Sequence, residues 1–169
     1  MHYLKFLLKS SNQHGVHSPF VYDLVTNCFY KKNKASVGKF LFPKSFRLKH
    51  LEILNDFIAH ANIKTTHICC KENHFIRELP NIKKQEKSQS QKADLIYASH
   101  EYFDKKLLDS LYSKLHSNSI LIIELPYKNE KLWEKLKQQS ITQIVVDTYF
   151  FGFIFTKTSQ AKEEFLIRL

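Results

Sequence analysis

Three short apolar runs are the feature that most restricts the fold of this chain. They occupy residues 65–70, 94–98 and 119–125, and a polar or helical segment follows each of them. Runs of this length without alternation are typical of strands that are buried on both faces of a parallel sheet. Two further apolar runs, at 141–147 and 150–156, follow one another almost directly, which predicts an antiparallel hairpin. The sequence therefore predicts an α/β protein with a mainly parallel sheet and a C-terminal antiparallel hairpin.

Segments with helical spacing precede and separate these runs. Ser18-Pro19 combines an oxygen-bearing N-cap with proline at the first helical position, which indicates a helix start. One predicted helix runs from Ser18 to about Lys31, and a second covers 44–62. Two more begin at Asp104 and at Asn129. We expect residues 1–62 to form an N-terminal helical region and residues 63–169 the α/β core of one compact domain.

The polar run at 83–92 has no apolar residue that would anchor it to a core. Its composition predicts a mobile loop between the first two apolar runs.

Composition permits several partners and excludes some classes of protein. The chain of 169 residues is 43% hydrophobic and 14% aromatic, which excludes a disordered protein. Its formal charge of +10 is compatible with contact to nucleic acid, to an anionic membrane surface or to acidic partners. Many of its lysines fit ordinary solvated helix faces, so the charge alone does not choose between a solvated surface and a functional basic patch.

Cysteine usage and the N-terminal segment both bear on the compartment. The three cysteines, Cys28, Cys69 and Cys70, offer neither a disulfide framework nor the spacing of a metal site. The apolar run at 1–9 is too short for a signal peptide or a membrane span. We therefore expect a cytoplasmic protein without a transmembrane segment or a bound metal.

The turn after the first predicted strand contains no glycine. The chain has only three glycines, Gly15, Gly38 and Gly152, and the turn itself reads Lys71-Glu72-Asn73-His74. A phosphate or an adenosine approaches a strand-to-helix turn closely only where side chains are absent. The first strand therefore lacks the usual nucleotide-binding turn.

The order of N-terminal helices, βα units and a closing hairpin resembles a class I S-adenosylmethionine-dependent methyltransferase. More specifically, the chain is similar to a family of methyltransferase-like proteins from Bacteroidota. The stretches that carry this resemblance are 14–22, which includes His14-Gly15-Val16-His17-Ser18-Pro19, then 119–136 and 147–169. The resemblance implies a reduced Rossmann-like sheet, S-adenosylmethionine as cofactor and methyl transfer as the activity.

The resemblance also indicates where cofactor-binding residues belong. In this family the first strand runs into an acid and a glycine-rich turn, and the matching positions here include Cys70 and Glu72. The strand at 94–98 leads into Ser99-His100, where relatives tend to carry an acid, and the strand at 119–123 leads into Glu124. The candidate cofactor-binding residues are therefore Cys70, Glu72, Ser99 and Glu124.

Glu124 lies where a parallel strand is expected to end, at the edge at which open α/β sheets bind ligands. It is a candidate catalytic residue, although its carboxylate would equally serve to cap the next helix or to pair with Lys128. Tyr97, Tyr102 and Tyr127 are expected near the same edge, either bordering the core or stacking on a base.

His14 and His17 flank Gly15 just before the Ser18-Pro19 helix start, and they are the other candidate catalytic residues. Their imidazoles would either orient an anion or move a proton at a cleft, fix the entry turn by bonding its backbone, or bind a metal. We expect His17 to satisfy buried backbone groups.

Two functions follow from these observations. The first is a divergent methyltransferase-family protein in which methyl transfer is weakened or lost, because the cofactor turn is missing. The alternative is a non-catalytic binding or scaffolding protein that presents a basic or aromatic surface to nucleic acid or to a protein partner.

Overall fold

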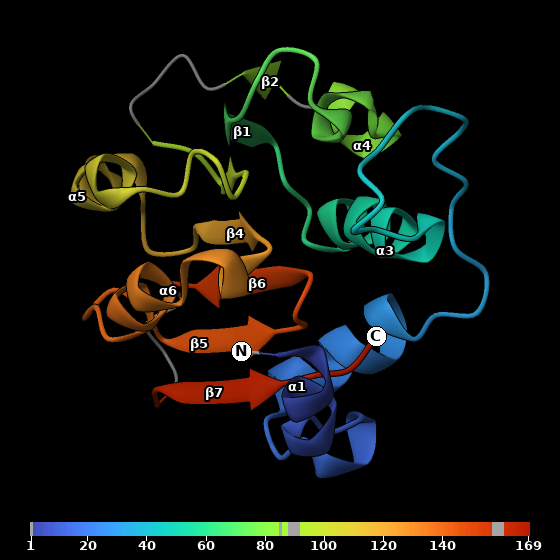
Figure 1. Ribbon diagram of the computed structural model, residues 1–169, viewed down its shortest axis with the longest axis vertical. Coiled ribbons are helices and arrows are strands. Elements are labelled where there is room, and N and C mark those ends of the chain that lie inside the picture. Colours follow the sequence, from blue (N-terminus) through green and yellow to red (C-terminus); the bar gives the residue numbers. More distant parts are fainter. Residues whose placement is uncertain (1, 85, 88–91, 157–160) are drawn as a thin grey trace.

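A mixed sheet lies at the centre of the computed structural model (Figure 1), which describes residues 2–84, 86–87, 92–156 and 161–169, without the side chains of 86, 87 and 112. In this part of the chain the sheet has seven strands in the order β2-β1-β3-β4-β6-β5-β7. The strands are β1 (Thr65–Cys69), β2 (Glu86–Lys87), β3 (Leu95–Ala98), β4 (Ile120–Glu124), β5 (Ile144–Asp147), β6 (Phe151–Phe155) and β7 (Glu163–Leu166).

One strand of the sheet runs against the others. β6 pairs antiparallel with both β4 and β5, whereas the other neighbouring strands pair parallel. The predicted α/β class and the predicted hairpin of β5 and β6 are therefore confirmed. The hairpin does not form the edge of the sheet, however, because β7 pairs parallel with β5 on its outer side. Glu163-Glu164 open β7, and a strand with such a polar start gives no apolar run to recognise.

Helices surround the sheet. The N-terminal ones are α1 (Tyr3–Lys9), η1 (Gln13–Gly15), α2 (Pro19–Asp23), the π-helical segment η2 (Leu24–Phe29) and α3 (Leu48–His60). The later ones are η3 (Phe75–Glu78), α4 (Pro80–Lys83), α5 (Lys105–Lys114), η4 (Pro126–Asn129) and α6 (Glu130–Lys137). The helix predicted to reach Lys31 thus ends at Phe29, and the one predicted over 44–62 covers 48–60. No helix in the described part of the chain has the length and apolar character needed to span a membrane.

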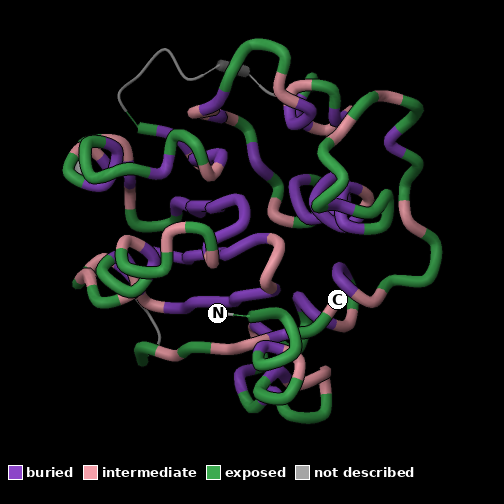
Figure 2. Tube along the Cα trace, in the orientation of Figure 1, coloured by how far each residue is buried: buried purple, intermediate pink, exposed green. Residues whose placement is uncertain are grey.

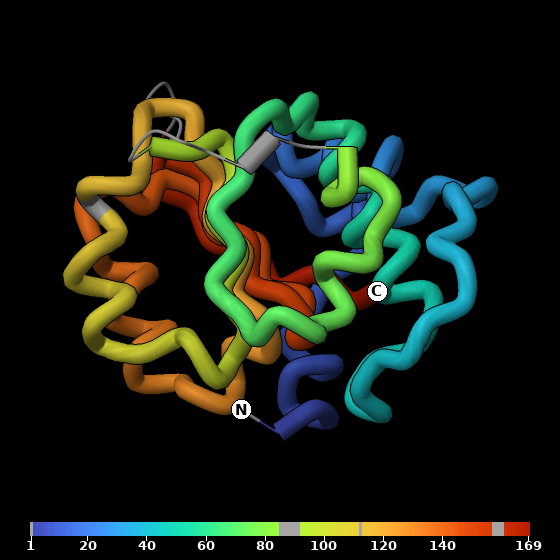
Figure 3. The backbone as a smooth tube through the Cα atoms, turned by 90° about the horizontal axis from the view of Figure 1, so that it is seen from above, coloured from blue at the N-terminus to red at the C-terminus, as the bar shows by residue number. Residues whose placement is uncertain are grey.

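Alternate residues of each central strand point to opposite faces, so the sheet has two cores. Tyr97 and Ile122 pack with the N-terminal helices and α3, whereas Ile96 and Leu121 pack with α5 and α6. Figures 1 and 3 show the sheet between these two helical layers. Figure 2 shows the central strands as buried and the outer surfaces of the helices as exposed.

The N-terminal helices belong to the first of these cores. The ring of Phe153 on β6 lies 5.3 Å from that of Phe29 on η2 and 4.8 Å from that of Phe57 on α3. Each phenyl ring buried in such a cluster adds apolar area and favourable ring contacts. The helical region and the sheet are therefore packed together, while the boundary at residue 62 stays a prediction.

The polar run at 83–92 differs from the expected loop. Lys83 ends α4, and Glu86–Lys87 forms β2, which pairs parallel with Thr65-Thr66 of β1. The prediction is wrong for these two residues, because backbone pairing does not require apolar side chains. Residues 85 and 88–91 lie outside the described part, so the mobility expected there stays a prediction.

Candidate functional site

Glu124 ends β4 at the carboxyl edge of the parallel strands, and its side chain is 1% exposed. Its strand neighbours are β3 and the antiparallel β6, and both are fully buried in the centre of the sheet. A carboxylate in such a place must be supplied with hydrogen bonds, because an ionised group without them is strongly destabilising in the interior.

Three side chains from two other segments supply these bonds. Tyr97 on β3 donates its hydroxyl to Oε2 of Glu124 at 2.5 Å, and Nε2 of His74 lies 2.9 Å from the same oxygen. Nδ1 of His100, which follows β3, lies 2.9 Å from Oε1. We call Glu124, Tyr97, His74 and His100 the Glu124 centre.

The second nitrogen of each histidine fixes the position of the ring proton. Nδ1 of His74 accepts from the backbone N–H of Ile76 at 3.3 Å, so its Nε2 carries the proton that Glu124 accepts. Nε2 of His100 lies 3.2 Å from Nζ of Lys128, an obligate donor, so Nδ1 of His100 is the donor to Glu124. Both rings are therefore oriented as donors to one carboxylate.

These bonds decide the charge of the centre. Burial raises the pKa of Glu124, but the hydrogen bonds from His74, Tyr97 and His100 outweigh burial and hold the pKa below its ordinary value. Burial and the neighbouring negative charge of Glu124 raise the pKa of Tyr97 well above its ordinary value. At neutral pH the centre is thus an ionised carboxylate that accepts from a neutral phenol.

A cavity of about 310 Å³ opens beside the Glu124 centre. Its polar wall is formed by Lys71, His74, Ser99, His100 and Glu124, and its apolar wall by Phe75 and the segment 41–43. The hydroxyl of Ser99 is buried and has no hydrogen-bond partner among the described residues. On the rim, Nζ of Lys71 lies 2.8 Å from Glu101. The cavity therefore combines an unsatisfied buried hydroxyl with an oriented imidazole.

The predicted cofactor residues divide into two groups. Ser99 and Glu124 both line this cavity. Cys70 is buried, and burial raises the pKa of its thiol, which makes it a poor nucleophile. Glu72 is exposed and does not line the cavity.

The candidate histidines near the N-terminus lie elsewhere. The side chains of His14 and His17 are exposed, and neither lines the cavity beside Glu124. The expectation that His17 satisfies buried backbone groups is therefore wrong, since its exposed ring reaches water instead. Ser18 is the N-cap of α2 with Pro19 after it, as predicted, but its hydroxyl makes no capping bond. Ser18 is buried with that hydroxyl unpartnered among the described residues.

Sequence reasoning missed part of the centre. One alternative was that Glu124 pairs with Lys128. In the structure Lys128 contacts His100 instead, and His100 in turn donates to Glu124. His74 was recognised only as a residue of the glycine-free turn. His74 and Glu124 are far apart in the chain, so no local sequence pattern connects them. The available signal is that three histidine or tyrosine side chains lie near strand ends at one edge of the sheet, which indicates a shared partner.

A second buried carboxylate ends β5, which β6 separates from β4 in the sheet. Asp147 accepts from the indole N–H of Trp133 at 3.0 Å and from the backbone N–H of Tyr149 at 2.7 Å. Burial raises the pKa of Asp147 more than these bonds lower it. Gly152 lies directly opposite Asp147 on β6 and against the face of Trp133. The raised pKa follows from burial within this packed group.

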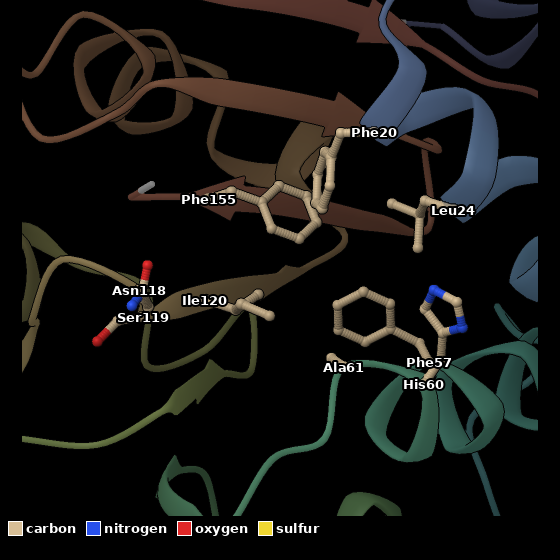
Figure 4. Close-up of a pocket in the computed structure, with 9 residues that line it drawn as sticks. All are labelled: Phe20, Leu24, Phe57, His60, Ala61, Asn118, Ser119, Ile120 and Phe155. Atoms are coloured by element: carbon tan, nitrogen blue, oxygen red, sulfur yellow. The ribbon is translucent and has the colours of Figure 1, made fainter. Parts of the chain in front are cut away.

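Another cavity, of about 270 Å³, lies at the amino edge of β4 (Figure 4). Its walls are mainly the rings of Phe20, Phe57 and Phe155, with Phe20 and Phe155 edge to face at 4.9 Å. His60 stands on its rim beside Asp23, with 3.4 Å between Nε2 and Oδ2. This apolar cavity is separate from the Glu124 centre.

Metal ligation has no support in the described part of the chain. There, no group of three or more histidine, cysteine, aspartate or glutamate side chains is placed to hold a metal ion.

Comparisons with known proteins leave the family open. No family profile matches the chain, and searches of curated proteins and of solved structures give no significant match. The functional argument therefore depends on the geometry of the site.

Proposed function

We propose that this protein is a divergent class I methyltransferase-fold protein that has lost methyl transfer from S-adenosylmethionine and instead binds a small polar ligand at the Glu124 centre. The observation that carries this proposal is the position of His74. Its ring leaves the turn after β1 and reaches the carboxylate of Glu124 at the end of β4, 2.9 Å away. A side chain thus occupies the edge of the sheet at which this fold class binds its cofactor.

The turn after β1 does not fit the cofactor. Lys71, Glu72 and Asn73 bring exposed side chains to this turn, and His74 is bonded at both ring nitrogens. A close approach of a methionine or ribose group requires backbone without side chains at this point. None of the residues at the turn offers that access, so we derive no methyl-transfer step.

The sheet supports the resemblance in a limited way. The closing hairpin is one of the features on which the resemblance depends, and its reversed strand β6 lies between β4 and β5. The strand order changes direction between β1 and β3, since β2 lies on one side of β1 and β3 on the other. Open α/β sheets bind ligands at such a point, and Ser99 at the end of β3 borders it.

The cavity has the features of a binding site for a small polar ligand. The unpartnered hydroxyl of Ser99 gains a hydrogen bond only if a ligand or water enters. His100 is held by Glu124 in one orientation, and Lys128 adds a positive charge next to it. A ligand that carries an acceptor satisfies the hydroxyl of Ser99, and a negative charge on that ligand is attracted by the ammonium group of Lys128.

The proposal is tested by calorimetry with S-adenosylmethionine and with its demethylated product. We expect no saturable heat with either compound at micromolar concentration. The measured melting temperature must also stay constant in the presence of each compound, because a ligand that binds only the native state raises stability. Saturable binding would restore an active methyltransferase as the better interpretation.

A matched pair of variants tests the role of the cavity. In a thermal-shift screen of small anions and polar metabolites, any compound that stabilises the protein should lose its effect in Ser99→Ala. The same compound should keep its effect in Ser110→Ala, whose hydroxyl on α5 donates to the backbone carbonyl of Leu107 and does not line the cavity. Equal loss in both variants would place the ligand outside the cavity and contradict the binding site.

The alternative of a binding protein for a macromolecular partner depends on another surface. The specific observation in its favour is a long basic segment between η2 and α3. A salt series with generic RNA or DNA tests the nucleic-acid version, because phosphate contacts make affinity fall steeply with salt.

A further inference from the structure

The segment 31–49 is the most basic part of the chain, and we call it the basic strap. No acidic residue occurs between Asp23 and Glu52. The strap carries seven cationic residues, which are Lys31, Lys32, Lys34, Lys39, Lys44, Arg47 and Lys49. All of them except the half-buried Lys34 are exposed. The strap therefore presents a concentrated positive charge to solvent.

The strap also exposes aliphatic side chains. Leu41 is 97% exposed and Leu48 is 47% exposed. The neighbouring rings of Phe40 and Phe42 are only half-buried, pack against each other at 6.1 Å and contact the core. Leu41 is therefore an aliphatic side chain held almost entirely in water between the lysines of the strap.

The strap is held in a defined position. Most of it, from 31 to 47, contains no helix or strand, and connections of this length are uncommon unless they are functional. Val37 and Phe46 are buried, and Asp56 on α3 accepts from the backbone N–H of Ala35 at 3.2 Å. In Figure 1 the strap runs along the outside of the molecule before it enters α3. These anchors leave Leu41 outside the core.

We propose that the basic strap docks the protein onto an anionic lipid surface, with Leu41 inserted among the headgroups. Charge complementarity selects an anionic partner, because the strap has no acid of its own. The fully exposed leucine selects a bilayer, since an aliphatic side chain gains by leaving water at the interface. Nucleic acid is the weaker match, because single strands bind through exposed aromatic rings, and the rings of Phe40 and Phe42 are half-buried against the core. Leu41 also borders the cavity beside Glu124, but the proposal does not depend on whether that cavity binds a ligand.

Another exposed leucine provides an internal comparison. Leu8 on α1 is 88% exposed. The lysines of its helix, Lys5 and Lys9, line a cavity together with Glu134 and Glu164. Their positive charge therefore faces two carboxylates, whereas six of the seven cationic side chains of the strap are exposed and the strap itself contains no acid.

The experiment is co-sedimentation of the full chain with vesicles of phosphatidylcholine alone and of phosphatidylcholine mixed with phosphatidylglycerol. We expect binding to the mixed vesicles only, and a decline of that binding as salt is raised, because salt screens the strap. Leu41→Ser should weaken binding about tenfold, the effect of withholding one leucine from an apolar environment. Leu8→Ser, the same change at similar exposure, should leave binding unchanged.

Charge and partner class are separated by two further measurements. The double change Lys39→Glu and Lys44→Glu should abolish vesicle binding while the melting temperature stays within a few degrees, since both side chains are exposed. Binding of a single-stranded RNA is measured with the same variants. RNA binding without vesicle binding, equal effects of Leu41→Ser and Leu8→Ser, or equal binding to both vesicle types would each overturn the proposal.

Discussion

Glu124 and Asp147 are both buried carboxylates at the ends of strands that run in the same direction, yet their pKa values are shifted in opposite directions. The pKa of Glu124 lies below its ordinary value of 4.5, whereas the pKa of Asp147 lies above its ordinary value of 3.8. In both cases burial alone raises the pKa. The difference comes from the number and origin of the donors.

Three side chains donate to Glu124, and two of them come from segments that border a cavity. Asp147 receives one side-chain donor, Trp133, and one backbone donor from its own turn. Donors from several elements stabilise an ionised carboxylate at a site, whereas donors from the same turn stabilise the packing of that turn. The comparison therefore marks Glu124 as the candidate site and Asp147 as a structural residue.

The largest effect is expected for Glu124→Ala. Removal of the carboxylate leaves the buried donors of Tyr97 and His74 without an acceptor. We expect the free energy of unfolding in urea to fall by about 3–5 kcal/mol. Glu124→Gln keeps one acceptor oxygen and should lose clearly less. Equal losses for the two variants would mean that the packing of the side chain, and not its hydrogen bonds, holds the centre together.

The next effect concerns the packing around Asp147. A Cβ placed on Gly152 would lie 2.5 Å from Cη2 of Trp133, which is itself buried. Gly152→Ala should therefore lower the free energy of unfolding by about 2 kcal/mol, as overpacking of a rigid core does. Gly38→Ala is the control for an open site, where the strain comes from a φ of +80° and no atom lies near the added carbon. A smaller loss at Gly152 than at Gly38 would show that the indole moves easily and that the Asp147 turn is loosely packed.

The pH dependence of stability should differ in sign between the two carboxylates. The lowered pKa of Glu124 means that its contribution is present above pH 4.5 and is lost as the pH falls through its folded-state pKa. The raised pKa of Asp147 means that its ionisation costs stability, and that this cost shrinks as the pH falls through its folded-state pKa and is absent below pH 3.8.

Urea unfolding of the wild type, Glu124→Gln and Asp147→Asn at several pH values measures the pH-dependent contribution of each carboxylate to the free energy of unfolding. On acidification the wild type should lose its advantage over Glu124→Gln and should gain relative to Asp147→Asn. The same direction for both variants would contradict the assignment of donors made above.

Sequence patterns were sufficient for the elements that have their own apolar signal. The runs at 65–70, 94–98 and 119–125 became β1, β3 and β4, and Asp104 begins α5 with its carboxylate accepting from Leu107 at 2.7 Å. β2 and β7 were not predicted, because their pairing is a backbone property and their side chains are largely charged.

The candidate site was predictable only in part. Glu124 was placed at the carboxyl edge from the position of its strand, and Ser99 from the strand before it. The contribution of His74 was not foreseen, since it depends on how the turn after β1 folds over the edge towards β4. Contacts between residues so distant in the chain follow from tertiary packing and leave no local pattern.

The smallest effect is expected at a buried oxygen that has no donor at all. Ser18 precedes Pro19 at the start of α2, yet its hydroxyl makes no capping bond and is buried without a partner in the described part of the chain. Ser18→Ala removes an unsatisfied group, so the free energy of unfolding should change by less than about 0.5 kcal/mol. Asp104→Ala is the matched change at a helix start whose cap is formed, and it should cost about 1 kcal/mol. A loss of that size at Ser18 would mean that its hydroxyl does cap α2. The number of hydrogen-bond donors to a buried oxygen would then not predict how much that oxygen contributes to the free energy of unfolding.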